Sequence, residues 1–227
     1  TCTIIVTYNP TTNTTHNGQI DITYTNGVSG QTVSRPVTGT AVPPATITIS
    51  DGATYNYGTK ANGSSTDKTF TLTNTGSFTA SSVSGSGLSA PYSFKGGAYP
   101  GTGGTCAATM APAATCTIIV TFAPTSTGTH NGQIDIGYNN GVTTQTSSRG
   151  VTGIGAPPAV LAISDGATFN FGTKATGSST DKTFTVTNSG GIDAVSVSTA
   201  AITAPFSFKG GSYPGNGGTC STTIVAR

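Results

Sequence analysis

The chain has 227 residues, of which 34% are hydrophobic and only 7% are charged, and it contains 32 glycines but no Glu and no Trp. Its formal net charge of +2 is too small to predict binding to nucleic acid or insertion into a membrane, and no apolar run approaches the roughly 20 residues of a membrane-spanning helix. The scarcity of charged helix formers argues against helices, and regularly alternating apolar residues argue against disorder. The composition therefore predicts a folded, all-β chain.

The first stretch of the chain, TCTIIVTYNP at Thr1–Pro10, returns almost unchanged as TCTIIVTFAP at Thr115–Pro124. The two copies align at a constant spacing of 114 residues without insertion or deletion, and about two thirds of the aligned positions are identical. A period of this length matches a whole small domain rather than a solenoid unit. We therefore expect tandem domains arranged like beads on a string.

Two Pro-Pro pairs, at 43–44 and 157–158, follow strand-like segments and resemble stiff interdomain linkers. They predict a division of the chain into three parts. Residues 1–42 would be the C-terminal strands of an incomplete domain, and residues 43–155 would form a complete domain. Residues 156–227 would be the N-terminal part of a further domain, which a following chain or segment completes.

The first half of the complete unit alternates apolar and polar residues, as half-buried strands do. Ala45–Ser50 predicts a strand, and the Asp51-Gly52 pair that follows predicts a turn. The segment Tyr55–Gly58 keeps an aromatic residue on each side of an Asn in both copies, which indicates that these rings fill the core. Lys68–Asn74 then predicts a second strand, whose Thr-rich face suits solvent.

The second half begins with Thr115–Phe122, a strand whose alternation predicts one buried face. That face holds Cys116, Ile118, Val120 and Phe122. Gln133–Tyr138 predicts the next strand, the Asn140-Gly141 pair favours a type I′ hairpin, and a last strand covers roughly residues 143–152. About seven short strands with frequent turn signals are typical of an immunoglobulin-like β-sandwich.

Several motifs occur in the order found in a known family. They are FNFGTKATGSSTDKTFTVTNSGG, FSFKGG, GGTC, TCTIIVTFAPTSTGTHNGQIDI and a closing VTGIG. In these motifs the whole chain resembles the bacterial ASH/Hydin-like immunoglobulin domains, often found in proteins labelled choice-of-anchor D. The resemblance implies a sandwich held by a Cys-Cys clip and used as a spacer, scaffold or adhesive module. It brings no catalytic residues to transfer.

The four cysteines allow three pairings, and the repeat favours a bond between Cys106 and Cys116, ten residues apart. Such a bond would stabilise the domain by about 2–3 kcal/mol in the chain-entropy model, and it implies an oxidising compartment. A zinc site is the alternative, but the chain has no C-x-x-C motif and its two His are far away in sequence. We therefore expect a disulfide and no metal.

The two remaining cysteines, Cys2 and Cys220, are expected to bond with a neighbouring repeat or subunit. If another copy followed the chain, its Cys2 would lie after Cys220 at nearly the spacing that separates Cys106 from Cys116. Strands equivalent to residues 1–40, from a longer polypeptide or from a neighbouring subunit, would then complete the last domain. A head-to-tail contact of this kind propagates into a filament.

Three classes of function remain. The first is a structural repeat unit of an extracellular or bacterial cell-surface fibre, stalk or long adhesin, whose weakly charged surfaces also allow lateral bundling. The second is a module that binds a surface glycan or a protein receptor through Tyr99 and Tyr213, in the exposed loops GGAYPG and GGSYPG, unless these rings pack between domains.

An enzyme is disfavoured, and no cofactor is expected. His16 and His130 are one repeat position seen twice, and a turn residue bonded to a nearby carbonyl is the simpler interpretation. Without Glu, paired carboxylates could come only from seven Asp residues, most of them at turns or strand edges. No nucleophile or phosphate-binding motif stands out.

Overall fold

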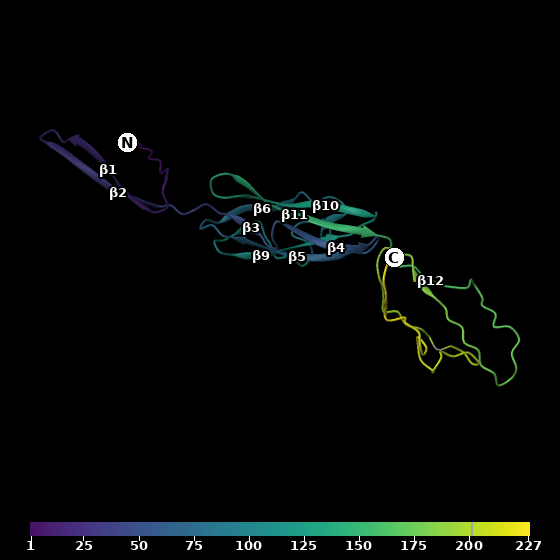
Figure 1. Cartoon of the computed structure of the whole chain (residues 1–227). Coiled ribbons are helices and arrows are strands. Elements are labelled where there is room, and N and C mark those ends of the chain that lie inside the picture. The colour runs from purple at the N-terminus through teal and green to yellow at the C-terminus, as the bar shows by residue number, and fades with distance from the viewer. Residues whose placement is uncertain (201) are drawn as a thin grey trace.

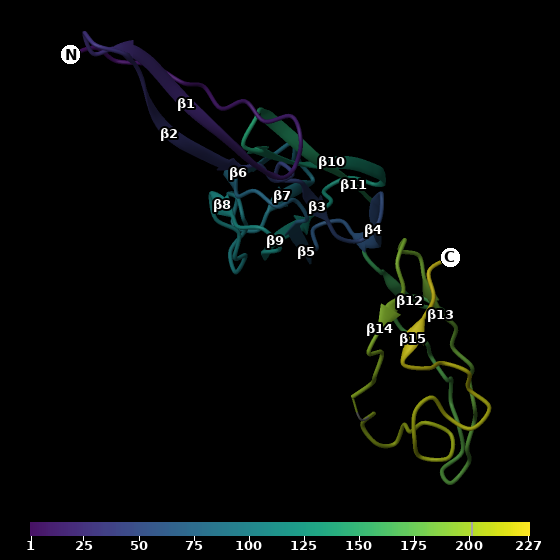
Figure 2. The same ribbon diagram turned by 90° about the vertical axis from the view of Figure 1, so that its left-hand side faces the viewer.

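The computed structural model describes residues 1–200 and 202–227, which form three parts that follow one another in an elongated arrangement (Figures 1 and 2). No helix occurs among these residues, so none that could cross a membrane is found there. The predicted all-β class is confirmed. The first part is a hairpin of β1 (Thr15–Thr25) and β2 (Gly30–Thr40), preceded by residues 1–14, which form no strand.

The middle part is a sandwich of two sheets, with strand orders β4-β11-β10-β6-β8 and β3-β5-β9-β7. All neighbouring strands are antiparallel except β4 and β11, which are parallel. The strands are β3 (Ile47–Ile49), β4 (Thr54–Ala61), β5 (Thr66–Asn74), β6 (Ala80–Ser86), β7 (Tyr92–Phe94), β8 (Thr109–Met110), β9 (Thr115–Phe122), β10 (Gly128–Asn139) and β11 (Thr144–Ala156).

The core of this part lies between the two sheets, because alternate residues of each strand point inward. In β9, the side chains of Ile118, Val120 and Phe122 are fully buried, as the alternation predicts. The ring of Phe122 stacks on Tyr92 at a centroid distance of 4.9 Å and meets Tyr57 at 5.5 Å. These aromatic rings fill the middle of the sandwich.

One buried polar side chain, Asn74 at the end of β5, joins segments that are distant in sequence. Its Nδ2 donates to the carbonyl oxygens of Phe78 (2.8 Å) and Met110 (3.0 Å). Its Oδ1 accepts from the backbone N–H groups of Thr46 (3.2 Å) and Gly76 (3.1 Å). Asn74 therefore supplies hydrogen-bond partners to backbone groups of four residues in this part of the sandwich.

The hairpin between β10 and β11 differs from the predicted type I′ turn. Asn140 N–H donates to the Thr143 carbonyl (3.0 Å), so the two central residues are Gly141 and Val142. Of these two, only Gly141 has a positive φ, 96°, whereas a type I′ turn needs a positive φ at both. The turn is displaced by one residue because the Asn140 side chain accepts hydrogen bonds from the N–H groups of Val142 and Thr143.

The third part repeats the first half of the sandwich with fewer strands. They are β12 (Leu161–Ile163), β13 (Val186–Asn188), β14 (Ala194–Val195) and β15 (Thr223–Ile224). Each lies 114 residues after a strand, or part of one, in the middle part. Residues 168–175 and 206–208, which correspond to β4 and β7, are not strands. In the sandwich β4 pairs with β11 and β7 with β9, and among residues 156–200 and 202–227 no strand pairs with either segment.

Candidate functional site

The first ten residues expose a row of apolar side chains that their repeat counterparts bury. Val6 is 59% exposed, whereas Val120 at the same position of β9 is 0% exposed. Ile4 and Tyr8 are exposed in the same way, although they lie on the same face of the alternating pattern as Val6. We call this row, Ile4, Val6 and Tyr8, the donor strand face.

The β1–β2 hairpin continues this exposed surface. Tyr24 is 53% exposed, whereas its counterpart Tyr138 in β10 is 6% exposed. Ile22 and Val37 are also exposed, and their counterparts Ile136 and Val151 are buried in the sandwich. A two-stranded hairpin has no second layer to cover its apolar side, so this surface is unpartnered within the N-terminal part.

Contacts between residues 1–14 and the hairpin reproduce those of the sandwich. Tyr8 packs directly on Gly39, as Phe122 packs on Gly153. Tyr8 Oη lies 2.9 Å from His16 Nδ1, and together they line a groove against Gly39. The donor strand face is therefore held beside the hairpin in the relation that β9 has to β10 and β11.

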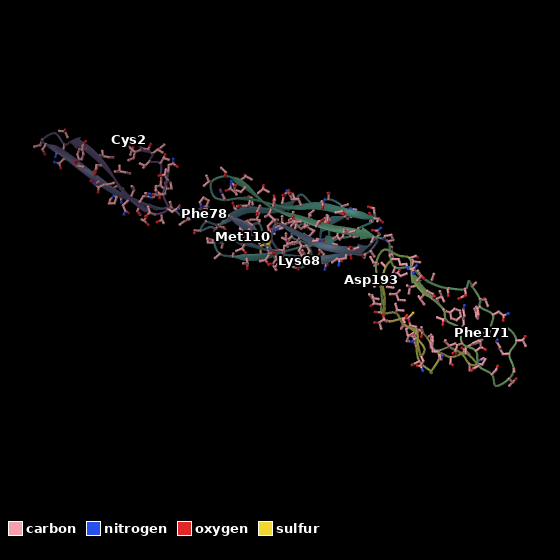
Figure 3. The ribbon with its side chains drawn as sticks, viewed as in Figure 1. Cys2, Lys68, Phe78, Met110, Phe171 and Asp193 are labelled. Atoms are coloured by element: carbon pink, nitrogen blue, oxygen red, sulfur yellow. A yellow bond between two sulfur atoms is a disulfide. The ribbon has the colours of Figure 1, made fainter. Side chains whose placement is uncertain are left out.

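The C-terminal part also exposes apolar side chains whose repeat counterparts lie in the sandwich core. Phe206 is 56% exposed, whereas its counterpart Tyr92 is 2% exposed. Its ring lies 5.7 Å from that of Phe171, which Figure 3 shows in this part of the molecule, far from Cys2. Ile163 and Phe184 are exposed too, although their counterparts in β3 and β5 are buried. We call the surface formed by Ile163, Phe171, Phe184 and Phe206 the acceptor face.

Cys106 and Cys116 form a disulfide within the sandwich. Cys2 and Cys220 are free thiols, with Cys2 exposed and Cys220 half-buried. The two bonded cysteines occupy the same repeat positions as the two free ones, since Cys116 corresponds to Cys2 and Cys106 to Cys220. The sequence predicts that Cys2 and Cys220 bond with a neighbouring repeat or subunit, and this stays a prediction.

A family model described as HYDIN/CFA65/VesB-like, Ig-like domain matches residues 50–150. This stretch covers most of the sandwich, which is therefore similar to this family. The ASH/Hydin-like resemblance seen in the sequence is thereby confirmed, and an Ig-like domain of this type indicates a structural or binding module. None of the curated proteins matches the chain.

Three solved structures are similar to the chain. The Vibrio cholerae VesB protease has 13% identity and a TM-score of 0.39, and the match covers 49% of this chain and 32% of that one. An ASH/PapD-like domain of human CEP192 has 17% identity and a TM-score of 0.39, covering 51% and 89%. A protein of unknown function from Porphyromonas gingivalis W83 has 11% identity and a TM-score of 0.38, covering 65% and 68%. The chain thus spans about a third of the length of VesB.

The two tyrosines considered for ligand binding are half-buried in the Ig-like parts of the chain rather than exposed. The ring of Tyr99 packs edge-on against the ring of Phe94, with 5.6 Å between the centroids. It also lies over Gly85, where a side chain would collide with it. Burial raises the pKa of Tyr99 to about 12, so this phenol stays protonated near neutral pH. Tyr213 packs on Phe208 in the same manner. These rings therefore offer a ligand little surface.

The histidines take local roles in both copies. His130 Nε2 lies 2.9 Å from the Ser126 carbonyl, and His16 bonds with Tyr8 and Thr12. Among the residues that the structure describes, no group of three or more His, Cys, Asp or Glu side chains could hold a metal ion. Sequence reasoning did not single out Gly39 and Gly153 as ring contacts, although both copies carry a glycine after the same Val-Thr pair.

The salt bridge between Asp51 and Lys68 gives a prediction for low pH. Lys68 Nζ lies 2.8 Å from Asp51 Oδ1, and this hydrogen bond, helped by one from Ser50, holds the pKa of Asp51 below its ordinary value of 3.8. A carboxyl with a lowered pKa stabilises the folded state above pH 3.8, and this contribution is lost as the pH falls through the folded pKa. We expect the free energy of unfolding of the Ig-like domain to fall below about pH 4.

Thermal unfolding between about pH 6 and pH 2 measures this loss, and Asp51→Asn is the matched variant. Asn tolerates the positive φ of 72° at this position but carries no charge. Because the pair is partly exposed, we expect Asp51→Asn to remove at most about 1 kcal/mol at neutral pH. If the unmodified chain and Asp51→Asn lose the same stability between these pH values, groups other than Asp51 are responsible for the loss.

Proposed function

We propose that the chain is a structural repeat unit of an extracellular fibre, stalk or long adhesin, in which residues 1–42 of a second copy complete the C-terminal domain. The observation that carries this proposal is that the donor strand face and the acceptor face are both exposed. Their counterparts in the sandwich are buried together in one core, as Val120 at 0% and Tyr92 at 2% exposure illustrate. The two faces are therefore complementary halves of one core.

Apolar burial supplies the driving force for this assembly. Each large side chain that moves from water into a core contributes about 1.5–3 kcal/mol, and main-chain ladders add directional pairing. The donor strand face and the acceptor face lie on different parts of the chain, so the contact between two copies is heterologous. A heterologous contact that does not close into a ring extends into a filament.

Polar groups at the two surfaces also match. In the sandwich, Arg149 donates to the Ile49 carbonyl, and Tyr138 Oη accepts from the Ile47 N–H at 3.2 Å. The corresponding hairpin residues are Arg35 and Tyr24, and they would find the same backbone groups in β12. Extracellular assembly is supported by the disulfide, since such bonds persist in oxidising compartments.

The test compares the purified 227-residue chain with a variant of the donor strand face. We expect filaments from the unmodified chain in electron microscopy and their loss in Val6→Asp, because a carboxylate cannot enter the acceptor core. Val28→Asp is the matched control, since Val28 is 93% exposed and its counterpart Val142 is exposed in the complete domain as well. Equal filament yields from Val6→Asp and the unmodified chain would overturn the proposal.

A denaturing gel of material isolated from its source, run with and without reductant, identifies where the donor strands come from; the size under reducing conditions is the one compared. A band at 22.4 kDa would place them on second copies. A single, very large species that is indifferent to reductant would place them on the same polypeptide, and it would overturn assembly from separate subunits.

A further inference from the structure

We propose that each junction of this assembly is locked by a disulfide between Cys220 of one copy and Cys2 of the next, with Tyr8 seated between Phe171 and Phe206 at the far end of the same strand. This inference rests on the proposed function and identifies a covalent modification site and the register of the donor strand. Three observations support it: the two free thiols, the pairing register of the repeat strand β9, and an exchange of Tyr and Phe between the sandwich and the incomplete parts.

The thiols occupy the positions of a pair that is already bonded elsewhere in the chain. In the sandwich, the disulfide between Cys106 and Cys116 connects the GGTC loop to β9. Cys220 lies in the second GGTC loop, and Cys2 lies on the donor strand. Cys2 is exposed and Cys220 is half-buried, so both thiols are accessible before assembly.

The pairing of β9 fixes where Cys2 would arrive. In the sandwich, Cys116 lies opposite Leu72 of β5, and Phe122 lies opposite Thr66. The counterparts of Leu72 and Thr66 in the C-terminal part are Val186 and Thr180. A donor strand in the same register therefore places Cys2 opposite Val186, at the end of the acceptor where Cys220 lies.

An exchange of aromatic residues supports this register at the other end of the strand. In the sandwich, Phe122 is surrounded by Tyr57 and Tyr92, whose hydroxyls donate to the carbonyls of Val120 and His130 at 2.9 Å each. The acceptor face has phenylalanine at both tyrosine positions, and the donor strand has tyrosine in place of Phe122.

The exchange retains three aromatic rings, but it removes two hydroxyls from the pocket and places one on the donor strand. The Tyr8 hydroxyl already has a partner on the donor itself, because it lies 2.9 Å from His16 Nδ1. It can therefore enter a pocket built from Phe171 and Phe206 without leaving a buried hydroxyl unpaired. The donor and acceptor surfaces are matched to each other at this position.

The chemistry is thiol–disulfide exchange. One thiolate first attacks an external disulfide, small or protein-borne, forms a mixed disulfide and releases one external thiolate; the second thiolate then attacks the protein sulfur of the mixed disulfide and releases the other external thiolate. The Cys220 Sγ–Cys2 Sγ bond forms, two protons and two electrons leave the two thiols, and the external disulfide is reduced to two thiols. The oxidant is thus a disulfide of the surrounding compartment.

Two variants of the full chain test the lock. Cys2→Ser retains only Cys220 as a free thiol, and Cys220→Ser retains only Cys2. Each is assembled alone and in a one-to-one mixture with oxidised glutathione, and the products are separated on a non-reducing denaturing gel. We expect the mixture to give a species of twice the 22.4 kDa subunit mass and each variant alone to stay at the subunit mass. The unmodified chain should give a ladder that collapses on reduction.

Electron microscopy of the same samples separates this inference from the proposed function. Filaments in the mixture without the two-subunit species would overturn the disulfide and leave head-to-tail completion standing. Two-subunit species of similar amount in each variant alone would also overturn it, because they would show head-to-head or tail-to-tail contact of the thiols. Absence of filaments from the unmodified chain would overturn the proposed function itself.

Discussion

Asn74→Ala is expected to lower the free energy of unfolding of the Ig-like domain by about 3 kcal/mol or more. The substitution leaves the carbonyls of Phe78 and Met110 and the N–H groups of Thr46 and Gly76 without the partners that the Asn74 side chain supplies. Each buried backbone group without a partner costs about 1–3 kcal/mol, and water can reach only some of them. Urea unfolding followed by fluorescence or circular dichroism measures the change.

Asn140→Ala is the matched control for this substitution. Asn140 also accepts two backbone hydrogen bonds, from Val142 and Thr143, but these groups lie in an exposed hairpin where water replaces the lost oxygen. We therefore expect its loss to cost no more than about 1 kcal/mol. Equal costs for the two substitutions would show that the partners of Asn74 are satisfied without it.

The network around Asn74 also shows why part of the fold could not be predicted from the sequence. The TN dipeptide at the end of β5 repeats in both copies, but two partners of Asn74, Thr46 and Met110, lie 28 and 36 residues away in sequence. The pairing of β3 with β5 brings Thr46 to Asn74, and the packing of the two sheets brings Met110. Alternation, in contrast, is a local property, so the buried face of β9 could be predicted from its own residues.

The surface loops were less predictable for the same reason. Tyr99 is surrounded in sequence by glycines and a proline, which are typical of an exposed loop, so the sequence alone predicts an exposed ring. In the structure its ring occupies the space over Gly85 and against Phe94, which come from β6 and β7. The repeat made the acceptor and donor surfaces predictable, because a complete copy within the chain shows what the incomplete parts lack.

Gly153→Ala is expected to destabilise the Ig-like domain by about 1–3 kcal/mol, although alanine usually suits a strand better than glycine. A Cβ atom at Gly153 would lie 2.7 Å from the ring of Phe122. That ring is fully buried and stacks on Tyr92, so it has no free space to move into. Gly137→Ala in β10 is the control, because its nearest neighbour would lie at 3.7 Å, in ordinary contact. We expect its effect to be near zero or slightly stabilising.

The same substitution in the first copy separates folding from assembly. A Cβ atom at Gly39 would lie 2.7 Å from the ring of Tyr8 and would push the donor strand away from the hairpin. Gly39→Ala should therefore reduce filament yield while the unfolding of the Ig-like domain, measured on the same sample, stays unchanged. Gly153→Ala should lower the unfolding free energy by opening the contact inside the domain. Unchanged filament yield in Gly39→Ala would mean that Tyr8 does not need Gly39 to enter the acceptor, and the Tyr8–Gly39 contact would then have no part in assembly.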